Sequence, residues 1–387
     1  MSLAEPLIIG MVAGEPSGDT LGAHLITALR EHLPNARFTG IGGPKMQTVG
    51  FEPLFPMEKL SVLGIVEVLR HFPELLGIRQ QLAAHFLHER PRVFIGIDSP
   101  DFNLDLEVKL KRAGIPTVHY VGPTIWAWRR GRIDKIRRAV SKVLVLFPFE
   151  PPLYERAAVP VAFVGHPLAD SLAKFPSREV VREQLRLPSS ARIVTLLPGS
   201  RVSELKQMGD LFVATADIIA ENVPEVLFLA PFVSRQTREM FEQALYRAES
   251  RTRNIQVLFG HSHEAMAAAD VVLATSGTAS LEAALLKRPL VITYKVAPIT
   301  AFIHRRQTYL RYIGMPNILA GEFIVPEFLQ EEATAENLAQ AVTNLLFDAT
   351  VRQRLEGRFA NMLAELRQDT ATKAAKEILP LLGGAPA

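Results

Sequence analysis

Cysteine is absent from this sequence of 387 residues. Disulfide bonds and thiolate metal sites are therefore excluded, and a reducing, cytoplasmic setting is consistent with the composition. Uncharged apolar runs of about 18 residues are also absent, so we expect no membrane-spanning helix. The opening segment Met1–Pro6 carries no basic side chain, and the apolar residues after it predict a strand rather than a secretory signal.

Two nucleotide-binding fingerprints are missing as well. Neither half of the chain contains G-x-G-x-x-G, and a P-loop with its lysine does not occur. A strong charge is also lacking, because the net charge is only +3. This mild basic bias does not indicate a nucleic-acid partner, but it is compatible with anionic substrates or an anionic membrane surface.

The segment His261-Ser-His-Glu264 is the nearest approach to a metal-binding cluster. His263 and Glu264 are adjacent and cannot face the same way on a helix. Ser262 as a helix N-cap explains the segment without a metal. We therefore expect no metal site and no other cofactor.

Short apolar segments alternate with helical patterns in both halves, which is typical of βαβ units and parallel sheets. The predicted strands are Leu7–Val12, Arg37–Ile41, Arg92–Ile97, Thr117–Val121, Lys142–Phe147, Val161–Val164, Ile193–Leu197, Val226–Ala230, Ile255–Phe259, Val271–Ala274 and Leu290–Tyr294. The sequence thus predicts an α/β protein with two Rossmann-like lobes facing a cleft. We place the lobes at residues 1–168 and 188–345. The C-terminal helices, at 346–387, are expected to cross back onto the first lobe or to pack on a partner subunit.

Polar loops follow the predicted strands of the second lobe. Ser276-Gly277-Thr278 comes after a buried strand and opens a helix, so its backbone N–H groups suit a phosphate group. Glu282 follows one helical turn later, where a carboxylate can accept from both hydroxyls of a ribose. Ser200-Arg201 ends another strand, and the arginine suits a leaving diphosphate. A capped helix and a surface arginine are the structural alternatives.

The first lobe carries carboxylates at the corresponding places. Asp98 ends the strand Arg92–Ile97, which makes it a candidate general base, although a turn or cap residue is the alternative. Asp101 is expected to cap the helix that follows. Glu15 stands at the entrance of an earlier helix, in Gly14-Glu-Pro-Ser17-Gly-Asp19, and is the one residue there that helix capping does not explain.

Residues 61–78 form the most apolar segment outside the strands. At helical spacing one broad stripe appears, which could face lipid, accept acyl chains or simply pack in a core. Its members are Val62, Ile65, Val66, Leu69, Phe72 and Leu76. Pro73 is expected to divide the segment into two helices. Both tryptophans, Trp126 and Trp128, precede a basic stretch that suits an anionic membrane surface or a phosphorylated substrate, or is an ordinary solvated face.

The ordered set of these segments closely resembles the lipid-A-disaccharide synthase family over nearly the whole chain. The matching segments are residues 13–19, 96–103, 120–128, 165–167, 197–201, 276–282, 316–317 and 319–321. Small departures at Pro16, Gly122 and Thr124 touch no charged position. The resemblance implies a two-lobed, metal-independent glycosyltransferase of the GT-B type that inverts the anomeric centre. It also implies a peripheral position at the cytoplasmic face of the inner membrane of Gram-negative bacteria.

The implied donor is UDP-2,3-diacylglucosamine, and the implied acceptor is 2,3-diacylglucosamine 1-phosphate. Asp98 would accept the proton of the acceptor 6-hydroxyl, Arg201 would stabilise the departing diphosphate, and Glu15 would orient a sugar hydroxyl. The residues expected to bind substrate are Ser17, Asn103, Trp128, Ser200, Ser276, Gly277, Thr278, Glu282, Asn317 and Gln330. The sequence leaves the oligomeric state open, with a homodimer as one expectation.

Two rival functions remain at this point. A UDP-sugar 2-epimerase would share the fold, but it would leave the apolar segment 61–78 without a role. A non-catalytic sugar-binding protein is the rival from another class, and the pair Asp98 and Arg201 argues against it.

Overall fold

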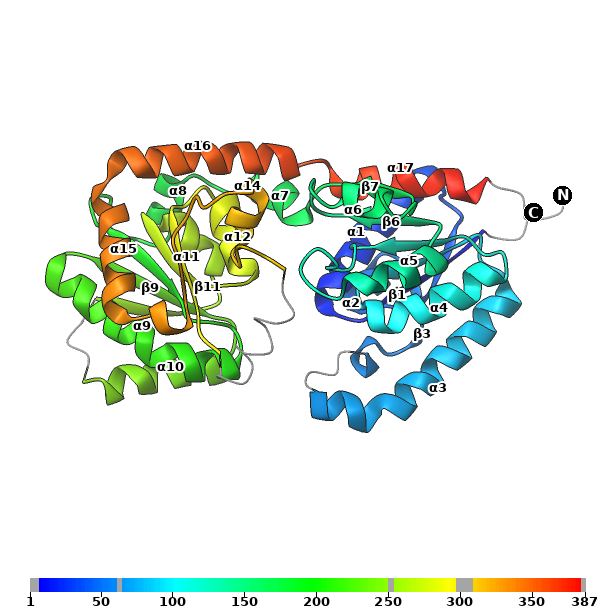
Figure 1. Cartoon of the computed structure of the whole chain (residues 1–387), viewed down its shortest axis with the longest axis horizontal. Helices are drawn as coiled ribbons and strands as arrows, with labels where there is room; N and C mark the ends of the chain where they lie inside the picture. The colour runs from blue at the N-terminus through cyan, green and yellow to red at the C-terminus, as the bar shows by residue number, and fades with distance from the viewer. Residues whose placement is uncertain (1–6, 61–64, 250–253, 297–308, 384–387) are drawn as a thin grey trace. The chain divides into compact units, whose positions relative to one another are not determined.

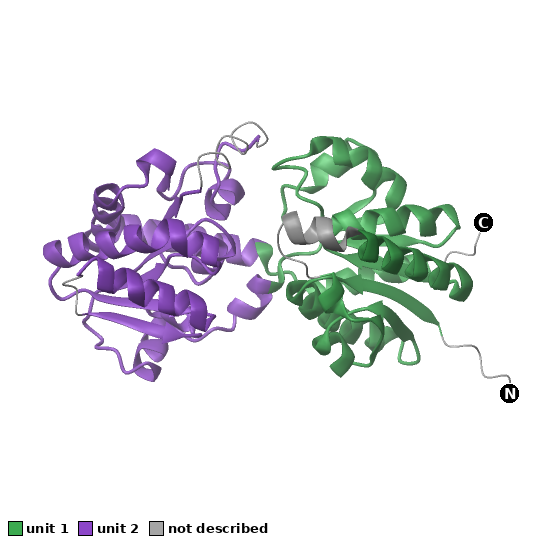
Figure 2. Cartoon of the chain, turned by 90° about the horizontal axis from the view of Figure 1, so that it is seen from below, with its two compact units in different colours: residues 1–167, 366–387 green, residues 168–365 purple. Residues whose placement is uncertain are grey.

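A computed structural model describes residues 7–60, 65–249, 254–296 and 309–383, and for residues 65–72 it describes the backbone alone. The chain forms two compact units (Figures 1 and 2). Unit 1 comprises Met1–Pro167 and Leu366–Ala387, and unit 2 comprises Leu168–Glu365. Each unit contains one sheet in which every paired strand is parallel.

The sheet of unit 1 has seven strands in the order β3-β2-β1-β4-β5-β6-β7. The strands are β1 (Ile8–Ala13), β2 (Arg37–Ile41), β3 (Phe51–Phe55), β4 (Val93–Ile97), β5 (Thr117–Tyr120), β6 (Lys142–Val145) and β7 (Val161–Phe163). The strand order reverses between β1 and β4, which is where open α/β sheets bind their ligands, at the carboxyl ends of the strands. Asp98 follows β4 directly, so it lies at this switch point.

Helices cover both faces of the unit 1 sheet. They are α1 (Pro16–His32), α2 (Pro44–Thr48), α3 (Ile65–Glu89), α4 (Pro100–Arg112), α5 (Ile133–Ala139), α6 (Pro151–Glu155) and α17 (Thr370–Leu382), with 3₁₀ turns η1 (Met57–Lys59) and η2 (Arg130–Arg132). Buried side chains of α1 and α17 share one core cluster with β1 and β4, whereas α3 and α4 contribute to a second cluster. The C-terminal helix α17 therefore returns to unit 1.

The sheet of unit 2 has six strands in the order β10-β9-β8-β11-β12-β13. The strands are β8 (Ile193–Leu197), β9 (Leu227–Phe232), β10 (Ile255–Phe259), β11 (Val271–Thr275), β12 (Leu290–Tyr294) and β13 (Glu327–Leu329). The helical elements are α7 (Pro167–Leu172), α8 (Arg178–Gln184), α9 (Val202–Asn222), α10 (Arg235–Arg247), α11 (Ser262–Ala268), α12 (Thr278–Leu285), α14 (Met315–Ala320), η3 (Gln330–Glu332), α15 (Ala335–Phe347) and α16 (Ala349–Leu366). The switch point here lies between β8 and β11.

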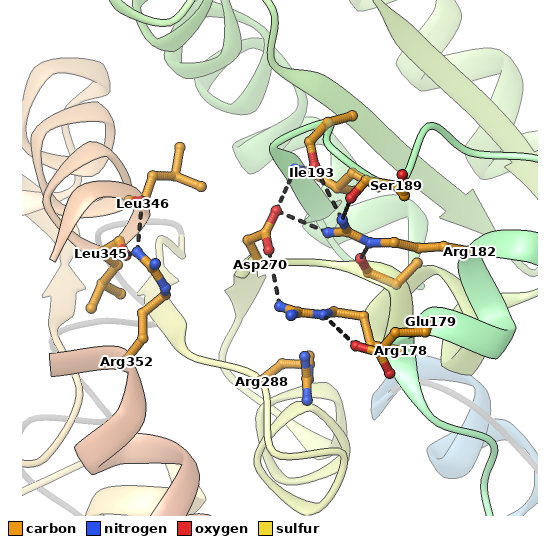
Figure 3. Close-up of polar contacts among 12 residues, drawn as sticks. Arg178, Glu179, Arg182, Ser189, Ile193, Asp270, Arg288, Leu345, Leu346 and Arg352 are labelled. Atoms are coloured by element: carbon orange, nitrogen blue, oxygen red, sulfur yellow. Dashed lines mark hydrogen bonds and ion pairs between the residues drawn. The ribbon is translucent and has the colours of Figure 1, made fainter. Parts of the chain in front are cut away.

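Asp270 lies at the amino ends of β8 and β11, opposite to the carboxyl ends where the switch point lies (Figure 3). Its carboxylate accepts from Arg182 Nη2 at 2.9 Å, from Arg178 Nη1 at 3.1 Å and from the Ile193 N–H at 2.8 Å. Arg182 is 7 % exposed and also donates to the carbonyls of Ala268, Ser189 and Ala191. A buried guanidinium with its donors bonded in this way ties α8 to the amino ends of β8 and β11.

Every strand predicted from the sequence is present, with ends shifted by no more than a residue or two. The sequence failed to predict β3 and β13, each of which is one of the two edge strands of its sheet; the other two edge strands, β7 and β10, were predicted. β3 contains Glu52 and Pro53, and β13 is three residues long, so neither shows the apolar run of a central strand.

Two predictions about helices were wrong. Pro73 does not divide the apolar segment, because α3 runs continuously from Ile65 to Glu89 with the proline inside it. An interior proline removes one hydrogen bond and bends a helix, and it need not end one. Asp101 does not cap α4, because the helix begins at Pro100 after Ser99. Asp101 lies in the first turn and pairs with Arg132 instead.

Candidate functional site

The carboxyl ends of the central strands of unit 2 surround a cavity of about 400 Å³. Its lining comes from the loops after β8, β9 and β11, from the end of β12 and from the first turns of the helices α9, α11 and α12. The predicted residues Ser200, Arg201, Ser276, Gly277, Thr278 and Glu282 all line this one cavity. The structure thus brings together most of the residues predicted for the second lobe.

The loop after β11 leaves space for a ligand in this cavity. Gly277 is the N-cap of α12 and has φ of 149°, a backbone conformation that side-chain-bearing residues rarely adopt. A Cβ at this glycine would have no atom within 4 Å, so the space over the loop is open. The N–H groups of Thr278 and Ala279, the first two residues of α12, have no acceptor within the helix, whereas that of Ser280 donates to the Gly277 carbonyl at 3.2 Å. The loop therefore suits a phosphate oxygen.

Glu282 lies one turn into α12, and its side chain is 19 % exposed. His263 Nε2, from α11, lies 3.5 Å from Glu282 Oε2. The hydrogen bond to this carboxylate raises the pKa of His263 above its usual range, although partial burial opposes the effect. No role at the site was predicted for His263, because its partner Glu282 lies in another helix.

The loop after β8 is held by a residue that the sequence analysis missed. Glu204 Oε2 accepts from the backbone N–H groups of Ser200 at 2.8 Å and Arg201 at 3.1 Å. Arg201 is the N-cap of α9, and its Nη1 donates to Glu204 Oε1 at 3.3 Å; its side chain is 73 % exposed, so the remaining guanidinium donors can reach a ligand. The spacing of three residues between the N-cap and Glu204 is the capping-box spacing, which was the available sequence signal.

Asn317 and Gln330 do not line this cavity. Asn317 is fully buried, and its amide donates to the Val325 carbonyl at 2.9 Å and to Glu327 Oε1 at 2.7 Å. Its oxygen accepts from the N–H groups of Ile324 and Val325. The side-chain amide of Gln330, in its better-matched orientation, pairs with the backbone of Val296 at 3.2 Å. Both amides are engaged by the protein's own backbone.

Asp98 occupies a strained turn at the end of β4 in unit 1. Its φ is 51° and that of Ser99 is 46°, both in the left-handed region. The Asp98 N–H donates to the Tyr120 carbonyl at 2.8 Å. Its side chain is half-buried, and its carboxylate makes no hydrogen bond or ion pair with any residue that the structure describes. Strained backbone with an unengaged carboxylate is typical of a functional position.

The loop after β1 adjoins the Asp98 turn. β1 and β4 pair so that Ala13 lies opposite Ile97, and a Cβ at Gly14 would come within 2.6 Å of Ser99 Oγ. Glu15 follows as the exposed N-cap of α1, and its side chain makes no capping bond. Ser17 is also exposed. The structure therefore brings Glu15, Ser17 and Asp98 to one edge of the unit 1 sheet.

Asn103 and Trp128 differ in their access to a ligand. Asn103 is fully buried and its amide nitrogen donates to the Asp98 carbonyl at 2.8 Å, so the structure does not expose it to a substrate. Trp128 is 37 % exposed, its Nε1 donates to Thr124 Oγ1, and the Arg129 guanidinium lies 4.3 Å from its ring centre. The Arg129 guanidinium also pairs with Asp101 Oδ2 at 3.6 Å, so this exposed cation–aromatic pair carries a positive charge that one carboxylate partly balances.

A buried carboxyl group that the sequence did not predict lies near the same edge. Glu150 is 2 % exposed, and its Oε2 accepts from the Phe147 N–H at 3.0 Å. Burial raises the pKa of Glu150 to about 8. A Cβ at Gly122 would lie 3.1 Å from Glu150 Oε1, so the glycine makes room for the carboxyl group.

The structure describes the side chains of only part of the predicted lipid-facing stripe. Val62 lies outside the described residues. Ile65, Val66, Leu69 and Phe72 fall on α3 where only the backbone is described, and Leu76 is half-buried. Across the described ranges, no helix has the length and apolar character needed to cross a membrane. The same ranges contain no group of three or more His, Cys, Asp or Glu side chains suited to a metal ion.

Two Rossmann-like units, each with a parallel sheet and a switch point, define a two-lobed α/β protein of the GT-B fold. Solved structures show the same fold. A putative UDP-N-acetylglucosamine 2-epimerase from Listeria monocytogenes matches with a TM-score of 0.64 and 11 % identity, covering 97 % of this chain and 95 % of that chain. WaaG, a glycosyltransferase involved in lipopolysaccharide biosynthesis, matches with a TM-score of 0.56 and 14 % identity over 97 % of this chain and 100 % of that chain.

Sequence comparison defines the family. The family model described as lipid-A-disaccharide synthetase matches residues 9–379. The lipid-A-disaccharide synthase of Methylobacillus flagellatus is 53 % identical over 97 % of this chain and 99 % of its own. That of Dechloromonas aromatica is 52 % identical over 97 % and 98 %. The chain belongs to the lipid-A-disaccharide synthase family, and the epimerase similarity extends to the fold alone.

Proposed function

We propose that this enzyme transfers a 2,3-diacylglucosamine unit from its UDP donor to 2,3-diacylglucosamine 1-phosphate. The products are the β-1,6-linked disaccharide 1-phosphate and UDP. Family membership supports the reaction, and one observation supports the chemistry: the Asp98 carboxylate, at the switch point of unit 1, has no hydrogen-bond or ion-pair partner among the described residues. The cavity of unit 2 complements it, because it offers a phosphate-type loop and a carboxylate for a nucleotide.

In this proposal Asp98 acts as the general base. It accepts the proton of the acceptor 6-hydroxyl while that oxygen attacks the anomeric carbon. One displacement inverts the anomeric centre, so no covalent enzyme intermediate is required. A base needs to be available and within hydrogen-bond reach of the hydroxyl. The half-buried carboxylate, held by a fixed backbone turn, supports the first condition. Glu15, on the adjoining loop, is assigned to orient a sugar hydroxyl.

The donor is assigned to the cavity of unit 2. The first N–H groups of α12 and the exposed Arg201 guanidinium stabilise the negative charge that develops on the departing UDP. Glu282 accepts from the ribose hydroxyls, and Ser200, Ser276, Gly277 and Thr278 complete the lining. The geometry gives less support to Asn317 and Gln330, whose amides are engaged elsewhere.

The acceptor and the membrane are assigned to unit 1. The exposed pair Trp128 and Arg129 suits an anionic lipid headgroup or membrane surface. The apolar stripe on 61–78 is assigned to acyl chains or to the membrane, with the enzyme peripheral at the inner membrane. A homodimer remains a prediction from the sequence.

The test is the release of UDP from a labelled diacylglucosamine donor, with and without the lipid acceptor. A synthase releases UDP and forms disaccharide only when the acceptor is present. An epimerase would interconvert the donor sugar without an acceptor, and a binding protein would release nothing. UDP release that is independent of the acceptor would contradict the proposed reaction.

A further inference from the structure

The turn that carries Asp98 requires support from its surroundings. Asp98 and Ser99 both have left-handed backbone conformations, with φ of 51° and 46°. This conformation is unfavourable for any residue other than glycine. The Asp98 backbone is bonded on both sides, because its N–H donates to Tyr120 at 2.8 Å and its carbonyl accepts from Asn103 Nδ2 at 2.8 Å. These two bonds hold the Asp98 backbone in place, and the backbone determines the direction in which the side chain points.

Asn103 makes the second of these bonds from a buried position on α4. Its amide nitrogen also lies 3.5 Å from the carbonyl oxygens of Val12 and Ile97, at the ends of β1 and β4. Carbonyl oxygens are acceptors, so the side-chain atom that faces these three must be a donor. The NH₂ group of Asn103 therefore points toward them, which determines the orientation of the amide. One side chain thus links the Asp98 turn to both strands of the switch point.

The oxygen of the same amide shows that this arrangement is unfavourable for stability. Asn103 Oδ1 is buried without a hydrogen-bond partner in the part of the chain that the structure describes. An unpaired buried polar atom destabilises a fold, because its hydrogen bonds to water are lost without replacement. An apolar residue at this position would avoid the penalty. The donor function of the amide accounts for its presence at this buried position.

A buried pair, Glu107 and His119, packs beside Asn103 at Gly96. Glu107 Oε1 lies 2.8 Å from His119 Nδ1, and both side chains are fully buried. Burial raises the pKa of Glu107. A Cβ on Gly96 would come within 2.2 Å of Glu107 Oε1 and 3.0 Å of Asn103 Cβ, so both side chains fill the space that this glycine leaves. Asn103 is therefore packed against the strand with little freedom to rotate.

We propose that Asn103 is a positioning residue for the reaction: through its bond to the Asp98 carbonyl it holds the Asp98 carboxylate in the orientation that accepts a proton. Asn103 does not contact the substrate, in contrast to the binding role expected from the sequence. The inference rests on the proposed role of Asp98 as the general base. A displacement of about 1 Å at a reacting group lowers turnover by about 100-fold, so the effect of losing this bond is measurable.

The test is a double-mutant cycle of Asn103→Ala with Asp98→Ala, measured as kcat and as the KM for the lipid acceptor. The matched control is Thr117→Val, which removes a buried hydrogen bond of 2.7 Å at the opposite end of the same sheet. Thermal unfolding of each variant reports the change in stability. If Asn103→Ala does not fold, Asn103→Ser, which keeps one donor, is measured in the same cycle.

We expect Asn103→Ala to lower kcat about 10- to 100-fold with little change in KM, and to have no further effect once Asp98 is alanine. Thr117→Val should lower the unfolding temperature without this fall in kcat. An equal loss of kcat from Asn103→Ala in both backgrounds, or no loss in either, would overturn the positioning role while leaving Asp98 as base. Full activity of Asp98→Ala alone would instead overturn the base assignment, and the positioning role with it.

Discussion

Glu150 provides a pH-dependent test of the unit 1 core. Its carboxyl group is 2 % exposed, and burial raises its pKa from 4.5 to about 8. The folded chain therefore keeps this proton up to about pH 8, whereas the unfolded chain releases it near pH 4.5. The unfolded state binds fewer protons between these values, so stability falls as pH rises through the window. The slope from one such group is about 1.4 kcal/mol per pH unit.

The perturbation is Glu150→Gln, which keeps the shape and an oxygen to accept from the Phe147 N–H. All other titrating groups are shared with the wild type, so the difference between the two proteins isolates this carboxyl group. From pH 5 to pH 8 the variant should gain about 4 kcal/mol relative to the wild type, or roughly 10 °C in unfolding temperature.

The assay is thermal unfolding of both proteins, followed by circular dichroism at several pH values between 5 and 8. A difference in unfolding temperature that grows steadily with pH is the expected result. A constant difference across this range would show that Glu150 is already ionised in the fold, and would refute the reasoning.

Three further predictions concern unit 2. Gly199 has φ of 127°, and a Cβ there would lie 2.5 Å from Glu204 Cβ, so Gly199→Ala should destabilise the unit by about 1–3 kcal/mol and weaken UDP binding in calorimetry. Glu282→Gln should lower the pKa of His263 in an NMR titration, because the carboxylate raises it, and should weaken UDP binding about 10-fold. Asn317→Ala should lower the unfolding temperature by an amount equivalent to about 2–4 kcal/mol, because it leaves buried backbone groups without partners. Unchanged unfolding, an unchanged titration or unchanged UDP affinity would contradict the respective statement.

The central strands of both sheets were predictable because they are buried on both faces. A segment such as Ile193–Leu197 is apolar except for Thr195 and fully buried, and turn residues follow its end. The two missed edge strands lack this signal, because β3 contains Glu52 and Pro53 and β13 has only three residues. The continuity of α3 through Pro73 could not be predicted from the local sequence, because an interior proline can either end a helix or only bend it.

The site was predictable where backbone geometry alone determines it. The loops at Gly199 and Gly277 follow buried strands and open helices, which is visible in the sequence. The roles of His263, Asn103 and Asn317 depend on partners from other elements, and no local pattern gives such contacts. Asn103 and Asn317 were therefore expected to bind substrate, whereas the structure uses both amides within the protein.

The central claim is that Asp98 is the general base, and the most direct measurement is turnover of Asp98→Asn beside its UDP affinity. The matched control is Asp101→Asn, a nearby exposed carboxylate that pairs with Arg132. The account predicts that Asp98→Asn binds UDP normally and turns over about 10²- to 10⁴-fold more slowly, while the control stays close to wild type. Near-normal turnover of Asp98→Asn would contradict the account.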